Sequence, residues 1–306
     1  MRYEYVKRFI GFVCSLAILS GCTTSQSESF QDEPLSENHK KIFIGESHYK
    51  RGNSVYFSDT EIKNADSATF QLLDGYGYYA KDKNHVYFEA KLIRKADPET
   101  FEHLEYPYSK DKNYVYFQEI LIRRANPETF KHLRYAYSKD KNYVYRHEKR
   151  IEDADPDSFQ SLSGNYAKDK NYAYYLTKIL KGADTDTFQL LVEPYAKDKD
   201  FIYIGGKRIK GSDPDTFQLL YRGYSKDKNF VYYGINKIDD ADLDSFEVFI
   251  ADYAKDKNAV YSRGEIIEEA DLDSFEVLVG FYAKDKNYVY RFGKIVEGED
   301  PETFKP

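Results

Sequence analysis

Acidic residues that recur in pairs are the side chains of this chain best suited to binding a cation. Asp213 with Asp215 and Asp242 with Asp244 are two examples, each at the start of the same short segment. Carboxylate oxygens are the ligands that Ca²⁺ prefers, but the spacing matches neither the EF-hand loop nor the glycine-rich nonapeptide. The same residues also suit the start of a helix. A calcium-stabilised adhesive repeat is therefore only our third candidate function, after protein binding and glycan binding, and we predict no metal site and no cofactor.

Residue patterns that signal catalysis are missing from the sequence. It contains no His-Glu-x-x-His, Gly-x-Ser-x-Gly or phosphate-loop motif. A catalytic site is usually a unique cluster in a pocket, whereas the polar residues here recur evenly along the chain. We therefore predict no enzyme activity and no catalytic residue.

A cysteine near the amino terminus has the surroundings of a lipid attachment site. Three basic residues among the first eight precede an apolar run at 9–20, which has the length of a signal h-region and is too short to span a bilayer. The run ends in LSGC at 19–22, which resembles the lipobox of bacterial lipoproteins. This resemblance implies cleavage between Gly21 and Cys22, and acylation of Cys22. The alternatives are an ordinary secretory signal with an incidental cysteine, or a buried N-terminal helix.

The lipobox reading divides the chain into three parts and places it in the cell envelope. Residues 1–21 would be the signal peptide, 22–40 the lipidated cysteine with a polar, flexible tether, and 41–306 the folded domain. Thr23 follows Cys22 where an aspartate would favour retention in the inner membrane. We therefore expect the outer membrane, in a bacterium that has one.

Composition limits the possible partners and the source of stability. The net charge is -7, and removal of 1–21, with three basic residues and one acidic residue, leaves -9. Such a chain has no basic footprint for nucleic acid. Cys14 lies in the signal segment, so the mature chain would have no disulfide. The 31 tyrosines and 21 phenylalanines, with no tryptophan, indicate a core rich in aromatic packing.

A 29-residue repeat fills the remainder of the chain. Its most constant motif is Lys-Asp-Lys, whose aspartates are Asp82, Asp111, Asp140, Asp169, Asp198, Asp227, Asp256 and Asp285. A tyrosine recurs with the same step at Tyr87, Tyr116, Tyr145, Tyr174, Tyr203, Tyr232, Tyr261 and Tyr290. Tyr56, 31 residues before the first of these, belongs to an earlier, degenerate copy, so there are about nine units. A fixed period in this range is the signature of a repeat array.

The repeat resembles the DKNYY family, named for a run that appears here as DKNY at 111–114 and 285–288. The resemblance extends from about residue 49 to the end. It implies a bacterial origin and a repeat architecture, and it implies no activity, ligand or catalytic residue.

The unit itself predicts short strands and one helical turn. Residues 166–168 and 172–175 are β-prone, and the polar 169–171 between them suits a three-residue hairpin loop whose last residue, Asn171, is left-handed. A second turn and a third strand near Leu180 follow. In 154–159, Asp155 as N-cap and Pro156 as N1 favour a short helix. We therefore predict a β-rich tandem array, solenoid-like or superhelical, of antiparallel strands plus one helical turn per unit.

One unit has too few apolar side chains to outweigh the entropy of ordering 29 residues, so neighbouring units must stabilise one another. We expect Tyr87 and its equivalents inside, stacked as a ladder. The variable residues after them, which include Phe88, Arg146, Tyr175, Ser262 and Arg291, are expected outside.

The function that follows is a non-enzymatic envelope lipoprotein that acts as a protein-binding or scaffolding repeat module. The alternative is binding of a glycan, peptidoglycan or surface polysaccharide, through exposed tyrosines. The expected partners are a membrane, through the lipid, and an envelope protein or glycan.

Overall fold

The computed structural model describes residues 40–306. Gly21 and Cys22, with the signal segment and nearly all of the tether, lie outside the described residues. The described part of the chain consists of strands and turns, and no helix in it could cross a membrane.

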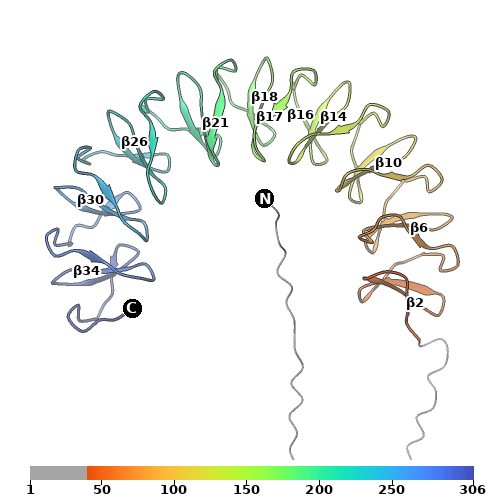
Figure 1. The fold of residues 1–306 in the computed structure, drawn as a ribbon, viewed down its shortest axis with the longest axis horizontal. Coiled ribbons are helices and arrows are strands. Elements are labelled where there is room, and N and C mark those ends of the chain that lie inside the picture. The colour runs from red at the N-terminus through yellow and green to blue at the C-terminus, as the bar shows by residue number, and fades with distance from the viewer. Residues whose placement is uncertain (1–39) are drawn as a thin grey trace, which may run out of the picture.

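Nine four-stranded antiparallel sheets follow one another along the chain, one sheet to a repeat unit. In each sheet the spatial order of the strands is the chain order. Figure 1 shows the sheets side by side around an arc, from the sheet that contains β2 to the sheet that contains β34. We number them as sheets 1 to 9 and call the segment between two sheets a connector.

The first sheets contain the longest strand pair of the array, β2 with β3. The strands of sheets 1 to 3 are β1 Ile42–Phe43, β2 His48–Arg51, β3 Ser54–Phe57, β4 Thr60–Glu61, β5 Gln71–Leu72, β6 Tyr79–Lys81, β7 Val86–Phe88, β8 Lys91–Leu92, β9 Glu102–His103, β10 Tyr108–Lys110, β11 Val115–Phe117 and β12 Ile120–Leu121. Those of sheets 4 to 6 are β13 Lys131–His132, β14 Tyr137–Lys139, β15 Val144–Arg146, β16 Lys149–Ile151, β17 Gln160–Ser161, β18 Tyr166–Lys168, β19 Ala173–Tyr175, β20 Lys178–Ile179, β21 Gln189–Val192, β22 Tyr195–Lys197, β23 Ile202–Ile204 and β24 Lys207–Arg208. Those of sheets 7 to 9 are β25 Gln218–Leu219, β26 Tyr224–Lys226, β27 Val231–Tyr233, β28 Asn236–Ile238, β29 Glu247–Val248, β30 Tyr253–Lys255, β31 Val260–Ser262, β32 Glu265–Ile266, β33 Glu276–Val277, β34 Tyr282–Lys284, β35 Val289–Arg291 and β36 Lys294–Ile295.

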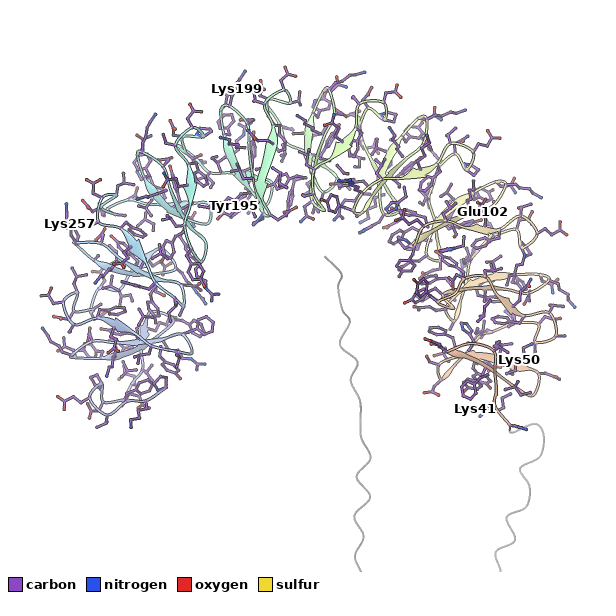
Figure 2. All side chains as sticks on the ribbon, in the orientation of Figure 1. Lys41, Lys50, Glu102, Tyr195, Lys199 and Lys257 are labelled. Carbon is purple, nitrogen blue, oxygen red and sulfur yellow. The ribbon has the colours of Figure 1, made fainter. Side chains whose placement is uncertain are left out.

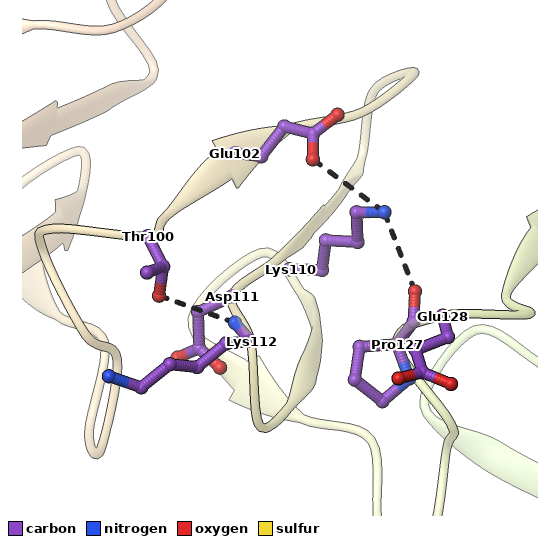
Figure 3. Close-up of a pocket in the computed structure, with 7 residues that line it drawn as sticks. All are labelled: Thr100, Glu102, Lys110, Asp111, Lys112, Pro127 and Glu128. Atoms are coloured by element: carbon purple, nitrogen blue, oxygen red, sulfur yellow. Dashed lines mark hydrogen bonds and ion pairs between the residues drawn. The ribbon is translucent and has the colours of Figure 1, made fainter.

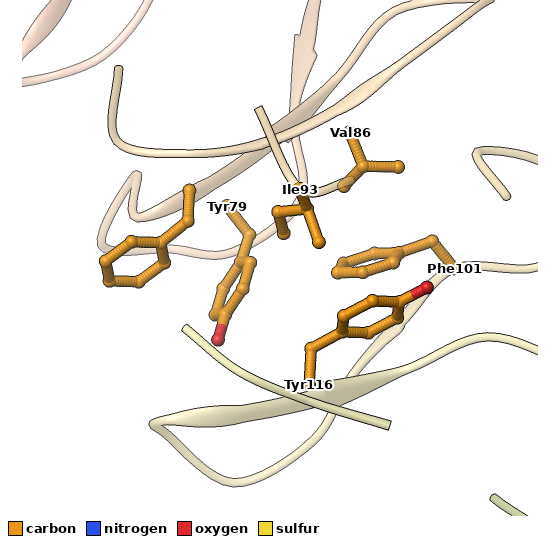
Figure 4. Packing of buried hydrophobic residues seen from close by; sticks show 6 residues of the cluster. Tyr79, Val86, Ile93, Phe101 and Tyr116 are labelled. Atoms are coloured by element: carbon orange, nitrogen blue, oxygen red, sulfur yellow. The ribbon is translucent and has the colours of Figure 1, made fainter. Parts of the chain in front are cut away.

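Both faces of an inner sheet are buried, each against a different neighbour. Successive residues of a strand point to opposite faces, so in sheet 5 Tyr166 and Ala173 face sheet 6 while Ala167 and Tyr174 face sheet 4. Each of the eight buried clusters in residues 40–306 combines side chains of two consecutive sheets and their connector. Figure 4 shows one such cluster, between sheets 2 and 3. The core is therefore a series of shared interfaces, and the expected dependence of each unit on its neighbours follows from it.

The β-rich tandem array is confirmed, but the predicted helical turn is wrong. Residues 156–158 make a single turn, and Gln160–Ser161 then forms β17, which pairs with Ala167 and Lys168 of β18. A strand ladder therefore uses the backbone groups that a helix would have needed. The expectation of a solenoid also fails, because each sheet has its own four strands and none of the described sheets continues into the next unit.

The hairpin loop of the unit differs from the prediction as well. It contains four residues, 169–172, and is closed by a bond from the backbone N–H of Asp169 to the carbonyl of Tyr172, 2.8 Å. Asn171 is not left-handed; the positive φ falls in the next turn, at Leu176 (58°). The aspartate side chain, described below, holds the loop and removes the need for a left-handed residue there.

The repeated tyrosines are fully buried, yet they do not form a ladder. Rings alternate across each interface, with Phe101 between Tyr79 (centroids 5.9 Å apart) and Tyr116 (6.1 Å). Two of the variable residues expected outside are buried, Phe88 at 4% and Ser262 at 7% exposure. Each of them lies in a sheet that has a neighbouring sheet on both faces. The residue that follows the core tyrosine is therefore covered as well.

Candidate functional site

The aspartate of each Lys-Asp-Lys motif is a buried acceptor of four hydrogen bonds. Oδ1 of Asp169 accepts the backbone N–H groups of Asn171 and Tyr172, both at 2.7 Å. Oδ2 accepts the hydroxyl of Tyr174 at 2.7 Å and the backbone N–H of Asp155 at 2.8 Å. Asp155 belongs to the connector before the sheet. The carboxylate therefore closes its own loop and also fixes the preceding connector.

The same burial recurs in every full copy of the motif. The eight aspartates, 2% to 4% exposed, are Asp82, Asp111, Asp140, Asp169, Asp198, Asp227, Asp256 and Asp285. Burial by itself would raise the pKa of Asp82, but donated bonds from Asp66, Asn84 and Tyr87 favour the charged form, and the pKa lies below its usual value. The pKa values of Asp256 and Asp285 are lowered in the same way. In these three copies the motif holds a buried carboxylate whose charged form is favoured by hydrogen-bond donors.

In most copies the two lysines of the motif bind the connectors on either side of the sheet. Nζ of Lys168 donates to the carbonyl of Thr185 in the following connector, 2.9 Å. Nζ of Lys170 pairs with Oδ2 of Asp155 in the preceding connector, 2.8 Å. Lys-Asp-Lys is therefore a joint between units, a role that turn chemistry alone does not predict.

The paired acids that suggested calcium have other partners. Oδ1 of Asp213 accepts the N–H and the hydroxyl of Thr216, at 3.0 and 2.8 Å, and Oδ2 pairs with Lys228 at 2.7 Å. The second acid, Asp215, is exposed to solvent. In residues 40–306 there is no group of three or more His, Cys, Asp or Glu side chains placed to hold a metal ion. The acid pairs shape turns and receive no support as calcium ligands.

A second tyrosine series, which sequence reasoning missed, joins most of the sheets to the next one. The hydroxyl of Tyr166 donates to the carbonyl of Pro194 and accepts the N–H of Gly206, both at 3.0 Å. The hydroxyl of Tyr79 reaches Pro107 in the same way, 2.8 Å. The signal was present in the sequence, since these tyrosines recur every 29 residues, two positions before the motif: Tyr79, Tyr108, Tyr137, Tyr166, Tyr195, Tyr224, Tyr253 and Tyr282.

Shallow polar clefts recur beside the motif. Figure 3 shows one of about 230 Å³, where Lys110 lies between Glu102 (3.6 Å) and the carbonyl of Pro127 (3.4 Å). Equivalent clefts lie at Lys168 and Lys255. In the first cleft the polar groups already bind one another, and its lining contains no nucleophile paired with a base. Its geometry suits a structural joint.

The inner and outer edges of the arc carry different residues. Figure 2 shows Tyr195, the first residue of β22, on the inner side and Lys199, just beyond the end of β22, on the outer side. Because the units share one register, the loops before each second strand lie on the inner side. Exposed aromatic rings gather in these inner loops: Tyr76 (81%), Tyr106 (47%), Tyr135 (55%) and Tyr221 (52%).

The fold and its joints define a tandem-repeat protein made of separate four-stranded antiparallel sheets. The family model of the DKNYY family matches residues 48–96, 79–203 and 195–306. The chain therefore belongs to the DKNYY family, as its sequence motifs indicated. No curated protein and no solved structure matches it.

Proposed function

We propose that the chain is a non-enzymatic, lipid-anchored module of a bacterial cell envelope that binds or scaffolds other proteins. One observation supports this best: the aspartates and tyrosines that recur in every unit are buried inside the array, whereas residues of the inner loops differ between units and are exposed. Asp169 and Tyr174 exemplify the first kind, and the inner-loop residues Tyr135 and Tyr221 the second. A row of unlike exposed residues on a regular scaffold suits recognition of a partner along its length.

The lipid anchor would determine where in the cell envelope the array is located. Cys22 would hold the chain on the outer membrane, since several acyl chains on one cysteine bind a bilayer stably. The tether up to residue 40 would then separate the array from the lipid surface. Metabolic labelling with a fatty-acid probe tests this part: the wild type takes up label and Cys22→Ala does not. An unlabelled wild type contradicts the anchor.

Glycan binding is the second candidate, and the first half of the inner edge favours it. The rings of Tyr76, Tyr78 and Tyr106 form a row there. The ring centroids of Tyr76 and Tyr78 are 6.3 Å apart, and those of Tyr78 and Tyr106 are 5.2 Å apart. Neighbouring aromatic faces of this kind offer stacking surfaces for sugar rings. Peptidoglycan or a surface polysaccharide would be the ligand.

Site-specific photo-crosslinking in the producing cell separates the two candidates. A photoreactive residue at Tyr135 or Tyr221 on the inner edge is compared with one at Lys199 on the outer edge. Discrete protein adducts from the inner edge, weaker at Lys199, support the scaffolding role. Co-sedimentation with purified peptidoglycan that is lost in a Tyr76→Ser, Tyr106→Ser variant supports the glycan role. If no protein adducts form and no co-sedimentation is seen, both candidate functions are contradicted.

A further inference from the structure

An apolar stripe runs along the first strands of the last four sheets. The two residues of each pair are two positions apart. The first of each pair sits in the same register in every sheet: Leu190 opposite Ala196, Leu219 opposite Ser225, Val248 opposite Ala254 and Val277 opposite Ala283. Leu190, Val248 and Val277 pack in part against the core. The second members of the pairs are Val192, Tyr221, Ile250 and Val279. The stripe therefore has one apolar pair per sheet, four sheets in succession.

The equivalent positions in sheets 3 to 5 are polar. They hold His103 and Glu105, His132 and Arg134, and Ser161 and Ser163. Because these sheets have the same fold and the same joints, the array does not need an apolar pair there. The stripe consequently requires an explanation outside the fold.

The stripe is open to solvent in the single chain. Val192 is 53% exposed, Tyr221 52%, Ile250 51% and Val279 67%. Four exposed apolar side chains in consecutive sheets make a contiguous patch of the kind that marks an interaction site.

The stripe deepens into a groove across sheets 7 to 9. We call this the apolar groove; it measures about 430 Å³ and is lined by Tyr221, Val248, Phe249, Ile250, Lys255, Phe275 and Val277. Six of these seven residues are apolar or aromatic, and three are branched aliphatic side chains. Aliphatic walls suit apolar protein side chains better than sugars, which prefer flat aromatic faces.

The one charged residue of the apolar groove, Lys255, has no carbonyl partner in the described part of the chain. Its equivalents in other sheets donate to a backbone oxygen 17 residues ahead, as Lys226 does to Leu243 and Lys284 to Pro301. For Lys255 no such bond is formed within residues 40–306; its Nζ lies 5.5 Å from the ring centre of Phe249. Neither Glu247, opposite it in the ladder, nor Asp273 in the adjoining cleft forms an ion pair with it in that range. Its ammonium group is free to bind a carboxylate.

We propose that the apolar groove docks a protein partner through an apolar side chain that stands next to a carboxylate, with Lys255 as the carboxylate's counter-ion. This inference rests on the proposed binding function and assigns it a place and a partner chemistry. The branched aliphatic walls select the apolar side chain, and the unpaired ammonium supplies the charge complementarity.

Fluorescence polarisation with three labelled, serine-rich dodecapeptides tests the docking site on the full chain. Their centres are Leu-Glu-Leu, Leu-Lys-Leu and Ser-Glu-Ser. The first binds most tightly, because only it has both the apolar and the acidic feature. Lys255→Gln weakens its binding about tenfold, the usual value of a charge-assisted hydrogen bond, and does not weaken the binding of Leu-Lys-Leu, whose ammonium group it no longer repels.

A double variant, Tyr221→Ser with Ile250→Ser, weakens Leu-Glu-Leu binding by tenfold or more. The matched control is Arg134→Ser with Tyr135→Ser, exposed residues of sheet 4, which leaves the binding unchanged. Circular dichroism verifies that both variants remain folded. The docking site is overturned if the three peptides bind equally or do not bind at all. It is also overturned if neither Lys255→Gln nor the double variant changes the binding. Cellular adducts at Tyr135 would still support the wider scaffolding role, whereas the absence of protein adducts at every position would contradict that role itself.

Discussion

The hydroxyl of Tyr174 donates a 2.7 Å hydrogen bond to Oδ2 of Asp169, and the same oxygen accepts the backbone N–H of Asp155. The tyrosine–aspartate bond recurs in all eight full copies of the motif, at 2.7 to 2.9 Å. The residues that characterise this family therefore hold one sheet to the connector before it.

Asp227→Asn should destabilise the array although it preserves the shape of the side chain. The amide that replaces Oδ2 is a donor, and it would face the hydroxyl of Tyr232 and the N–H of Asp213. We expect a loss of about 2–3 kcal/mol, the cost of leaving buried donors unpaired. Thermal unfolding followed by circular dichroism measures the loss. Asp215→Asn, on an exposed acid of the preceding connector, should change the stability by less than about 0.5 kcal/mol; equal effects would contradict the joint.

Tyr232→Phe should cost about 1.5–3 kcal/mol, because it removes one hydrogen bond from a buried carboxylate and retains the ring packing. Combined with Asp227→Asn, the loss should be smaller than the sum of the two single losses, since both act on one bond. A double-mutant cycle by chemical denaturation gives the coupling. Strict additivity would show that the hydroxyl and the carboxylate do not depend on one another.

Alkaline pH should unfold the array cooperatively. Burial raises the pKa of Tyr137 and of Tyr166 to about 12, above the ordinary 10.0. For a group whose folded pKa is raised, the stability is complete below the unfolded pKa and is lost as pH rises through the folded value. Between about pH 10 and pH 12 the stability should fall steeply. The tyrosinate absorbance near 295 nm should rise in one step together with the loss of circular dichroism. Gradual ionisation of a chain that stays folded would contradict this.

The first sheet should weaken on mild acidification. His48 in β2 is fully buried, and neither ring nitrogen has a hydrogen-bond partner within residues 40–306; burial lowers its pKa below 6.5, although Asp74 opposes the shift. Because the folded pKa is lowered, the stability is complete above about pH 6.5 and is lost as the pH falls. Amide exchange of Tyr49 and Val55 should therefore accelerate from pH 7 to pH 5, after correction for intrinsic rates. His48→Phe, which retains contact with Phe57 and Phe70, should abolish this; the same acceleration in the variant would exclude His48 as its cause.

The features of the fold that depend on the repeat period could be predicted from the sequence. The 29-residue step, the buried tyrosines, three of the four strands and the need for neighbouring units all follow from recurrence and from the small apolar content of a unit. The fourth strand, Gln160–Ser161, is two polar residues long and has no alternating pattern to reveal it. Asp155 and Pro156 suit a single turn as well as a helix, and only the pairing with β18 decides between them.

The joint itself could not be read from local patterns. Asp169 binds an N–H group 14 residues upstream, and Lys168 a carbonyl 17 residues downstream. Such contacts depend on how two sheets are placed in space. The same holds for the apolar groove, which lies across three sheets.

Each core belongs to two neighbouring units, so that only whole units can be removed. Deleting residues 166–194, 29 residues in register, joins Asn165 to Tyr195 and restores an intact interface. Deleting 166–179, which removes three of the four strands of sheet 5 (β18, β19 and β20), leaves two neighbours without a partner. The direct measurement is calorimetric unfolding of both chains. The first should show a single, slightly weaker cooperative transition, and the second should lose most of its unfolding enthalpy; equal tolerance of the two deletions would contradict the shared-core account.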